Sequence, residues 1–370
     1  MKIVFASYNN QPGYHSPDEW LKKIFRLVDL MKALIHYCPV AFVQHIGTES
    51  KFAHGDVEFH FLCTEKKDKH RFPLRMTSRI KRLKPDIVIV SGLRYPLQVM
   101  QLRWMLGKRV RIIGRHHADK APQGFRRILQ KLADRCFDTY LFTSLGNAND
   151  WKSSGIIKNK EKIFELPAAS TEFSRMHKAS CKLKTGMAGD RNFLWVGRLN
   201  ANKDPLTVLK GFDEYLAIKP GGKLYMIYQE DDLLPEVKEL IANCKNLQAA
   251  VVLTGHIPYN DLPAWYSAAD FYVSGSHREG GSYALLEAMA CGCIPVVTAI
   301  PAALKVIEDG KYGISFQPGD AGDLAEKIAG LSQIDQPALS LAIENYFKKE
   351  LSSEAIAVKL YDRCKKLLAK

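Results

Sequence analysis

Short apolar runs alternate with amphipathic segments along most of this chain, and the alternation occurs in two series. In the first half, six runs have the length and composition of buried strands: KIVFA, VAFVQ, VEFHFL, DIVIVSG, RVRIIG and TYLFTS. In the second half the pattern returns with NFLWVG, KLYMIY, AAVVLTG, FYVSG and IPVVT. Segments such as DEWLKKIFRLVDLMKAL, with apolar residues at helical spacing, separate the runs. This α/β pattern predicts two Rossmann-like, doubly wound domains, each a parallel sheet with helices on both faces.

The domain boundaries follow from where the alternation stops. Residues 170–190 are polar and without periodicity, which indicates a linker between a first domain over 1–175 and a second over 190–345. Residues 346–370 have a helical pattern, and this helix is expected to pack on the second domain or to cross back to the first. Because ligands of open α/β sheets bind beyond the carboxyl ends of the strands, two facing domains predict a site in the cleft between them.

Positive charge is concentrated in the first half of the chain. Residues 1–170 hold 30 Lys and Arg against 15 Asp and Glu, whereas residues 171–370 hold 23 against 24. Such a charge suits nucleic acid, an anionic membrane surface or a phosphorylated acceptor, and charge alone does not choose among them.

Two basic segments, RFPLRMTSRIKRLK and GFRRILQKLADRCF, have apolar residues at helical spacing. Each is either an ordinary packed helix with a solvated face or a basic amphipathic helix that lies on anionic lipid. The apolar positions are Met76, Ile80 and Leu83 in the first segment and Phe125, Ile128, Leu129 and Leu132 in the second.

Export and membrane insertion are not expected from the apolar runs. None reaches the roughly 20 residues that span a bilayer, and the run at the N-terminus is too short for a secretory signal. The eight cysteines lack the paired spacing of a zinc site and are expected to be free thiols. A cytoplasmic protein, peripheral at the inner membrane face, is therefore expected.

The stretch HREGGSYALLEAMACG places Glu279 and Glu287 on either side of seven residues that include a Gly-Gly. A strand precedes it, and Ser282 suits the N-cap of a helix that contains Glu287. Eight residues of helix span roughly 12 Å, so the two carboxylates are not expected to flank a single glycosidic bond. The free N–H groups at the helix start suit an anion, and the glutamates then accept hydrogen bonds from hydroxyls on either side of it. The alternative is a capped helix with Glu279 solvated and Glu287 paired to a lysine.

A second cluster lies in GRLNANKDP, directly after the strand NFLWVG. Arg198 forks to two phosphate oxygens and Lys203 adds a point charge, so the two residues suit a diphosphate and the charge that develops as it leaves. The alternative is a pair of surface charges at a helix start, although a cation is unfavourable beside that end of the dipole. The acidic run at 230–232 is expected to be a solvated loop, and no metal is implied.

Three segments in this half carry a family resemblance. WVGRLNANKDP, LTGHIPYNDLPAWYSAADFYVSGSHREGGSYALLEAMACGCIPVV and DGKYGISFQPGD resemble the C-terminal domain of GT-B-fold retaining glycosyltransferases of family four, the glycosyl transferases group 1. The resemblance implies that Glu279 contacts the donor sugar and Glu287 the nucleotide ribose, while Arg198 and Lys203 hold the diphosphate. It implies further donor contacts, mainly from backbone, at Gly255, His256, Ile257, Gly280, Gly281, Ser282, Tyr283, Ala284 and Leu285. The unusual Ser282-Tyr283 is the pair expected to bear on donor choice.

The N-terminal half resembles the family weakly. Such enzymes often place a histidine near the reacting sugar, and in RHHADK we prefer His117 to His116; the alternative for both is a surface or capping role. The first loop, NNQPGYHSPDEW, lacks the usual Gly-Gly, so its residues are assigned to the acceptor and not to the diphosphate. PAALK at 301–305 replaces a second common Gly-Gly, so the donor pocket is expected to be shaped differently there. Residues expected to bind the acceptor are Asn10, Gly13, Tyr14 and His15, and those expected to take part in catalysis are Glu279, His117, Arg198 and Lys203.

The resemblance implies a retaining, metal-independent hexosyltransferase that moves a sugar from a nucleoside-diphosphate sugar to a glycan or lipid-linked acceptor, in polysaccharide, lipopolysaccharide or glycolipid biosynthesis. No cofactor and no nucleic-acid partner are expected, and the basic N-terminal half is expected to touch an anionic membrane. One alternative is a GT-B enzyme that hydrolyses, epimerises or phosphorolyses its substrate. An alternative of another class is a nucleic-acid-binding or scaffold protein that uses the basic half.

Overall fold

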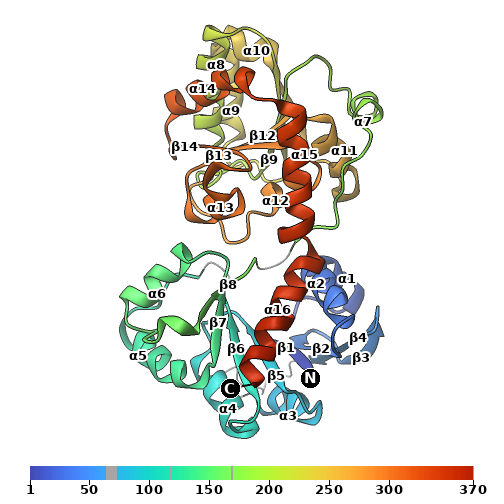
Figure 1. Ribbon diagram of the computed structural model, residues 1–370, viewed down its shortest axis with the longest axis vertical. Helices are drawn as coiled ribbons and strands as arrows, with labels where there is room; N and C mark the ends of the chain where they lie inside the picture. The colour runs from blue at the N-terminus through green and yellow to red at the C-terminus, as the bar shows by residue number, and fades with distance from the viewer. Residues whose placement is uncertain (64–72, 117–118, 168–169, 370) are drawn as a thin grey trace. The chain divides into compact units, whose positions relative to one another are not determined.

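A computed structural model of the protein describes residues 1–63, 73–116, 119–167 and 170–369 (Figure 1). The chain divides into two compact units: unit 1 comprises Met1–Ser170 and Ser353–Lys370, and unit 2 comprises Thr171–Ser352. Each unit is built on one sheet, and every run predicted above to be a strand forms one. The predicted α/β class is confirmed.

Unit 1 contains an eight-stranded sheet in the order β3-β4-β2-β1-β5-β6-β7-β8. All of its pairings are parallel except that of β3 with β4. The strands are β1 (Ile3–Gln11), β2 (Val40–Ile46), β3 (Ser50–His54), β4 (Val57–Cys63), β5 (Ile87–Ser91), β6 (Arg111–Arg115), β7 (Thr139–Phe142) and β8 (Ile163–Glu165). The helices are α1 (Pro17–Lys23), α2 (Phe25–Ile35), α3 (Leu74–Arg82), α4 (Pro96–Leu106), α5 (Gly124–Ala133), α6 (Asn149–Ser153) and α16 (Ser353–Leu368).

Both faces of this sheet are buried. Along β1, Ile3 and Phe5 belong to one apolar core and Val4 and Ala6 to another, because successive side chains of a strand point to opposite faces. Helix α16 contributes to the first core and packs against α2, although it follows the whole of unit 2 in sequence (Figure 1). Buried residues of α3, α4 and α6 contribute to the second core.

The two basic segments form α3 and α5, and they pack differently. Met76 and Ile80 are fully buried, so α3 is an ordinary packed helix. Helix α5 buries only Gln130 and Ala133. Most of the apolar side chains expected on its packed face lie at the surface instead.

Unit 2 contains a six-stranded sheet in the order β11-β10-β9-β12-β13-β14, and all of its pairings are parallel. The strands are β9 (Asn192–Gly197), β10 (Lys223–Tyr228), β11 (Val251–Gly255), β12 (Phe271–Ser274), β13 (Ile294–Thr298) and β14 (Ile314–Phe316). The helices are α7 (Lys178–Thr185), α8 (Pro205–Ile218), α9 (Leu234–Asn243), α10 (Lys245–Ala250), α11 (Leu262–Ala268), α12 (Tyr283–Ala290), α13 (Pro301–Val306), α14 (Ala321–Gly330) and α15 (Gln336–Tyr346). A π-helical turn, Phe347–Leu351, follows α15.

The segment expected to be a linker is largely part of unit 2. Helix α7 lies within residues 170–190 and packs against α11, with Cys181 buried in the core of the unit. Unit 2 therefore begins at Thr171 and not near residue 190. The polar composition misled the prediction because α7 is short and buries a single side chain.

All eight cysteines are free, as predicted. Within the described parts of the chain, no helix combines the length and the apolar character needed to cross a bilayer.

Candidate functional site

The chain order reverses in the middle of the unit 2 sheet, between β9 and β12. The chain passes outward from β9 through β10 to β11 on one side, and from β12 through β13 to β14 on the other. The connections after β9 and β12 therefore diverge at the carboxyl ends of two neighbouring parallel strands, which is where open α/β sheets bind ligands. The loop after β9 carries Arg198 and Lys203, and the loop after β12 carries Glu279.

These two loops are held together by several hydrogen bonds. The backbone N–H of His277 donates to the carbonyl of Asn202 at 2.8 Å, and the Asn202 side chain donates to the carbonyl of Arg278 at 3.0 Å. His277 Nε2 lies 3.0 Å from Asp204 Oδ2, while Oδ1 of Asp204 caps α8 at the N–H of Thr207. The shape of one loop therefore depends on the other.

Lys203 and Glu279 form an ion pair between Nζ and Oε1. Their side chains are 18% and 17% exposed, so the pair is largely shielded but open to a ligand. A cation that suits a phosphate and a carboxylate that suits a sugar hydroxyl thus meet at one point. In the free protein the charges of Lys203 and Glu279 neutralise each other. A ligand with a phosphate and a sugar hydroxyl would replace this ion pair with a phosphate contact to Lys203 and a hydroxyl contact to Glu279.

Arg198 lies on the same loop but is more exposed. Its Nη1 is 3.5 Å from Glu230 Oε2, and both side chains are more than half exposed. The backbone of this acidic segment also contacts the loop, since the N–H of Leu199 donates to the carbonyl of Glu230 at 2.9 Å. The expected solvated loop is therefore solvated at its side chains and anchored at its backbone.

Ser282 stands at the start of α12 in the left-handed region, with φ 45° and ψ 44°. It is 6% exposed, and its hydroxyl has no hydrogen-bond partner among the described residues. The expected N-cap hydrogen bond is absent at this position. Ser282 and Glu279 line the same small pocket.

That pocket is rich in hydroxyl groups. Ser274 Oγ lies 3.1 Å from Ser276 Oγ, and Thr298 Oγ1 donates to the carbonyl of Ser276 at 2.5 Å. Ala303, from the PAALK segment, forms part of the wall, so the departure noted in the sequence does bear on this pocket. Burial, and secondarily the charge of Glu279, raises the pKa of the Tyr272 phenol that also lines it.

Glu287 lies one turn further along α12 and is 3% exposed. Its Oε2 accepts a hydrogen bond from the hydroxyl of Tyr266 at 3.1 Å, and burial followed by this carboxylate raises the pKa of that phenol. The carboxylate is held inside the unit by a phenol. Its contact with a ribose remains a prediction.

The remaining predicted donor residues lie after β11 and around the start of α12. Gly255 ends β11 with φ 73°, which favours glycine, and His256 after it is exposed. A side chain on Gly281 would meet the Tyr283 ring at 3.0 Å, so this glycine lets the ring fold back over the loop. Ala284 and Leu285 line the pocket with Glu279.

In unit 1 the predicted acceptor residues follow β1. The strand extends to Gln11, so Asn10 lies at its end and not in a loop. Tyr14 is fixed, since its carbonyl accepts from Gly47 N–H at 2.8 Å and its ring packs on Trp20. His15 and Gly13 are exposed beside it. Two predicted residues are thus open to a ligand, and Tyr14 anchors the turn that presents them.

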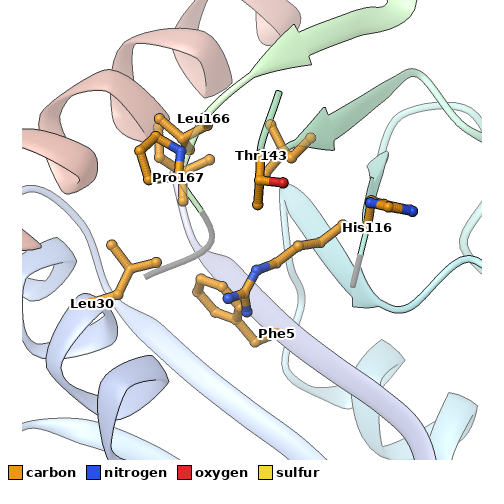
Figure 2. Close-up of a pocket in the computed structure, with 9 residues that line it drawn as sticks. Phe5, Leu30, His116, Thr143, Leu166 and Pro167 are labelled. Carbon is orange, nitrogen blue, oxygen red and sulfur yellow. The ribbon is translucent and has the colours of Figure 1, made fainter. Parts of the chain in front are cut away.

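His116 and His117 follow β6, and His117 lies outside the described residues. His116 is 2% exposed, stacks on Phe142 at 4.6 Å and places Nε2 at 3.0 Å from the carbonyl of Asp119. These contacts give it a packing role. It also borders a small pocket in unit 1, where Figure 2 shows Phe5 and Leu30 among the other lining side chains.

No group of three or more His, Cys, Asp or Glu side chains in the described ranges is arranged to hold a metal ion.

The family profile described as Glycosyl transferases group 1 matches residues 184–349, which contain both loops of the site. This part of the chain is therefore similar to the glycosyl transferases group 1. Mannosylfructose-phosphate synthase of Agrobacterium fabrum is 30% identical over 138 residues, which cover 35% of this chain and 30% of that protein. GDP-mannose:cellobiosyl-diphosphopolyprenol alpha-mannosyltransferase of Xanthomonas oryzae pv. oryzae is 27% identical over 173 residues, covering 46% and 43%. The chain thus spans less than half the length of these two curated relatives.

The fold of the chain is shared with solved structures over nearly its whole length. Anabaena HepE, solved in complex with UDP, superimposes with a TM-score of 0.73 at 14% identity and covers 99% of this chain and 100% of its own. The predicted GT-B fold is confirmed.

Sequence reasoning missed the residues that position the site. Asp204 could have been found, because an Asp-Pro pair ahead of an apolar periodic segment signals an N-cap. Its partner His277 and the phenol of Tyr266 carried no local signal, since they reach the site only through the order of the strands.

Proposed function

We propose that this protein transfers a sugar from a nucleoside-diphosphate sugar to a glycan or lipid-linked acceptor, with retention of anomeric configuration and without a metal ion. The observation that carries the proposal is the ion pair between Lys203 and Glu279, which joins the loops that follow β9 and β12, where the strand order of the unit 2 sheet reverses. Lys203 would bind the diphosphate and Glu279 a hydroxyl of the donor sugar. Donor binding would then separate the ion pair.

The groups around this pair support a diphosphate between a sugar and a nucleoside. The start of α12 has no side-chain cap hydrogen bond among the described residues, so its positive end would suit a phosphate, and Arg198 would rotate from its exposed contact with Glu230. Glu287, held by Tyr266, is proposed to meet the ribose, and the turn at Gly255 the base.

Leaving-group departure is assigned to cations of the chain itself. Arg198, Lys203 and the dipole of α12 would stabilise the negative charge that develops on the diphosphate, which is the electrostatic role that a divalent cation serves elsewhere. Front-face attack by the acceptor, with His117 near the reacting sugar, is the proposed route to retention.

The acceptor is proposed to bind in unit 1, near the turn that presents Gly13 and His15. The basic balance of that half suits an acceptor that carries phosphate. The relative from Xanthomonas oryzae is named for a diphosphopolyprenol acceptor, and this supports a lipid-linked one at the inner face of a membrane.

A thermal-shift panel of nucleoside diphosphates and nucleotide sugars tests donor binding, because a ligand that binds only the folded state raises its stability with affinity. The preferred donor then serves to test Glu279→Ala, with Glu239→Ala, an exposed glutamate on α9, as the matched control. Transfer is expected to fall by about 100-fold or more in the first variant, because a group that holds the reacting sugar is lost, and to stay unchanged in the second. A fully active Glu279→Ala variant would rule out the assigned role.

Product analysis separates transfer from its alternatives. Release of nucleoside diphosphate that never requires an acceptor would favour hydrolysis. An anomeric proton spectrum of the product tests retention, and full activity in excess chelator is the expected result for metal independence.

A further inference from the structure

Helix α5 of unit 1 presents apolar side chains to solvent. Phe125 is 72% exposed, Ile128 56% and Leu132 47%. Their spacing of three and then four residues puts them on one face of the helix. We call these three residues the α5 stripe.

A stripe of this kind is unusual on a packed helix. A surface helix normally turns its apolar residues inward, as α3 does with Met76 and Ile80. In α5 the inward residues are Gln130 and Ala133, and the outward ones are large and apolar. The neighbouring helix α4 also carries an outward aromatic side chain, Trp104, which is 82% exposed. In Figure 1, α5 lies at the outside of unit 1, on the opposite side from α1 and α2.

The charge beside the stripe is positive. Arg126 and Arg127 are exposed next to Phe125, and Arg127 Nε donates to the carbonyl of Ser154 at 2.7 Å. Residues 120–133 contain no Asp or Glu. Arg94, Lys120 and Arg126 also line a groove of about 940 Å³ beside α5, in which Asp119 is the acidic residue.

We infer that the α5 stripe and its arginines dock unit 1 onto the surface of an anionic phospholipid bilayer. The apolar side chains immerse among the lipid headgroups and upper acyl chains, and the arginines pair with lipid phosphates. Charge complementarity selects this occupant over an apolar protein partner, because cations flank the stripe without any carboxylate in the segment. The inference deepens the proposed function, since it supplies a surface that would bring a lipid-linked acceptor within reach.

The topology of unit 1 supports this arrangement. Strands β1 and β6 both run parallel to β5, which lies between them, so the carboxyl-terminal ends of these strands lie at the same end of the sheet. The turn with Gly13 and His15 follows β1 at that end, and the segment that leads into α5 follows β6 there. The acceptor turn and the start of the β6–α5 connection therefore lie at the same end of the strands, with β5 between the two strands that they follow.

Vesicle flotation of the full chain tests the inference, with phosphatidylcholine vesicles that contain or lack phosphatidylglycerol. The wild type is expected to bind the anionic vesicles and to release them as salt is raised. The triple substitution Phe125→Ser, Ile128→Ser and Leu132→Ser is expected to lower the partition coefficient about 100-fold, at about fivefold for each half-immersed side chain. Arg126→Glu with Arg127→Glu is expected to abolish the preference for anionic vesicles.

The matched control is Leu183→Ser in α7, because Leu183 is 88% exposed, apolar and isolated in unit 2. This variant is expected to bind vesicles like the wild type. Amide exchange should slow over 124–133 when vesicles are added, and not over 178–185.

Two results would overturn the docking surface: equal vesicle binding by the wild type and the triple variant, or retention of the wild type on DNA and not on anionic vesicles. A wild type that dimerises through the stripe without binding vesicles would also overturn it. Nucleotide binding is measured on the same proteins and is expected to be unchanged in the triple variant. Failure of vesicle binding is therefore distinguishable from failure of donor binding.

Discussion

Replacing Ser282 with alanine and with glycine separates two costs that this residue imposes on the free protein. One cost is its left-handed backbone, at φ 45°. The other is a hydroxyl that is buried without a partner among the described residues. Alanine removes the second cost and keeps the first, whereas glycine removes both.

The magnitudes follow from these two terms. Removal of an unsatisfied buried hydroxyl stabilises a protein by about 1 kcal/mol or more. Glycine gains about 1 kcal/mol over alanine at a left-handed position, net of the greater freedom of its unfolded chain. Ser282→Ala should therefore raise the free energy of unfolding of unit 2 by about 1 kcal/mol and Ser282→Gly by about 2 kcal/mol. Each kcal/mol corresponds to about 2–4 °C in unfolding temperature for a unit of this size.

Donor binding is expected to change in the opposite direction. If the hydroxyl binds the donor, its loss costs about 1.4 kcal/mol, or about 10-fold in Kd, and the two variants should lose the same amount. Thermal unfolding with and without the preferred nucleotide sugar measures both effects on one sample. Variants that are more stable and still bind the donor like the wild type would refute the role of the hydroxyl, and a destabilised Ser282→Ala would refute the account of its burial.

Three further predictions concern the ion pair, the loop contacts and acid stability. Lys203→Met should weaken donor binding and should destabilise unit 2 by about 1 kcal/mol, because Glu279 loses its cation. Adding Glu279→Gln should restore the stability but not the activity, and a double-mutant cycle measures the difference. His277→Ala should raise the donor KM by about 10-fold with less effect on kcat, since the two loops lose one contact, and His277→Gln, which retains a donor group, should recover part of it. Burial lowers the pKa of His60, so the unfolded chain takes up a proton that the folded chain does not. Stability should be complete above about pH 6.5 and fall as the pH drops below it, and unfolding temperatures should fall less steeply in His60→Gln.

The interior strands of both sheets could be predicted because each is a mostly apolar run and most of its side chains are buried. The strands that were missed are β3, β8 and β14, of which the first is largely exposed and the other two have three residues each. All three lie at or next to a sheet edge, where one side of the strand has little to pack against. Their sequences therefore carry no apolar run.

The candidate site divides in the same way. Glu279 and Lys203 were found because each lies in the loop that follows a predicted strand, in a segment with its own recognisable composition. The contacts that hold them were not, because His277 and Asp204 are 73 residues apart and meet only when β9 and β12 pair. The left-handed backbone of Ser282 was also missed, since serine at that position predicts an ordinary N-cap.

Helix α16 gives the chain a definite order of assembly. One face of the unit 1 sheet is closed by Ile356, Leu360 and Cys364, which are synthesised after the whole of unit 2. A nascent chain can therefore complete unit 2 while unit 1 still exposes an apolar face to chaperones. A fragment that ends at Ser352 would keep all of unit 2 and lack the helix that completes unit 1. The unit that begins first in the sequence is therefore the second to be completely synthesised.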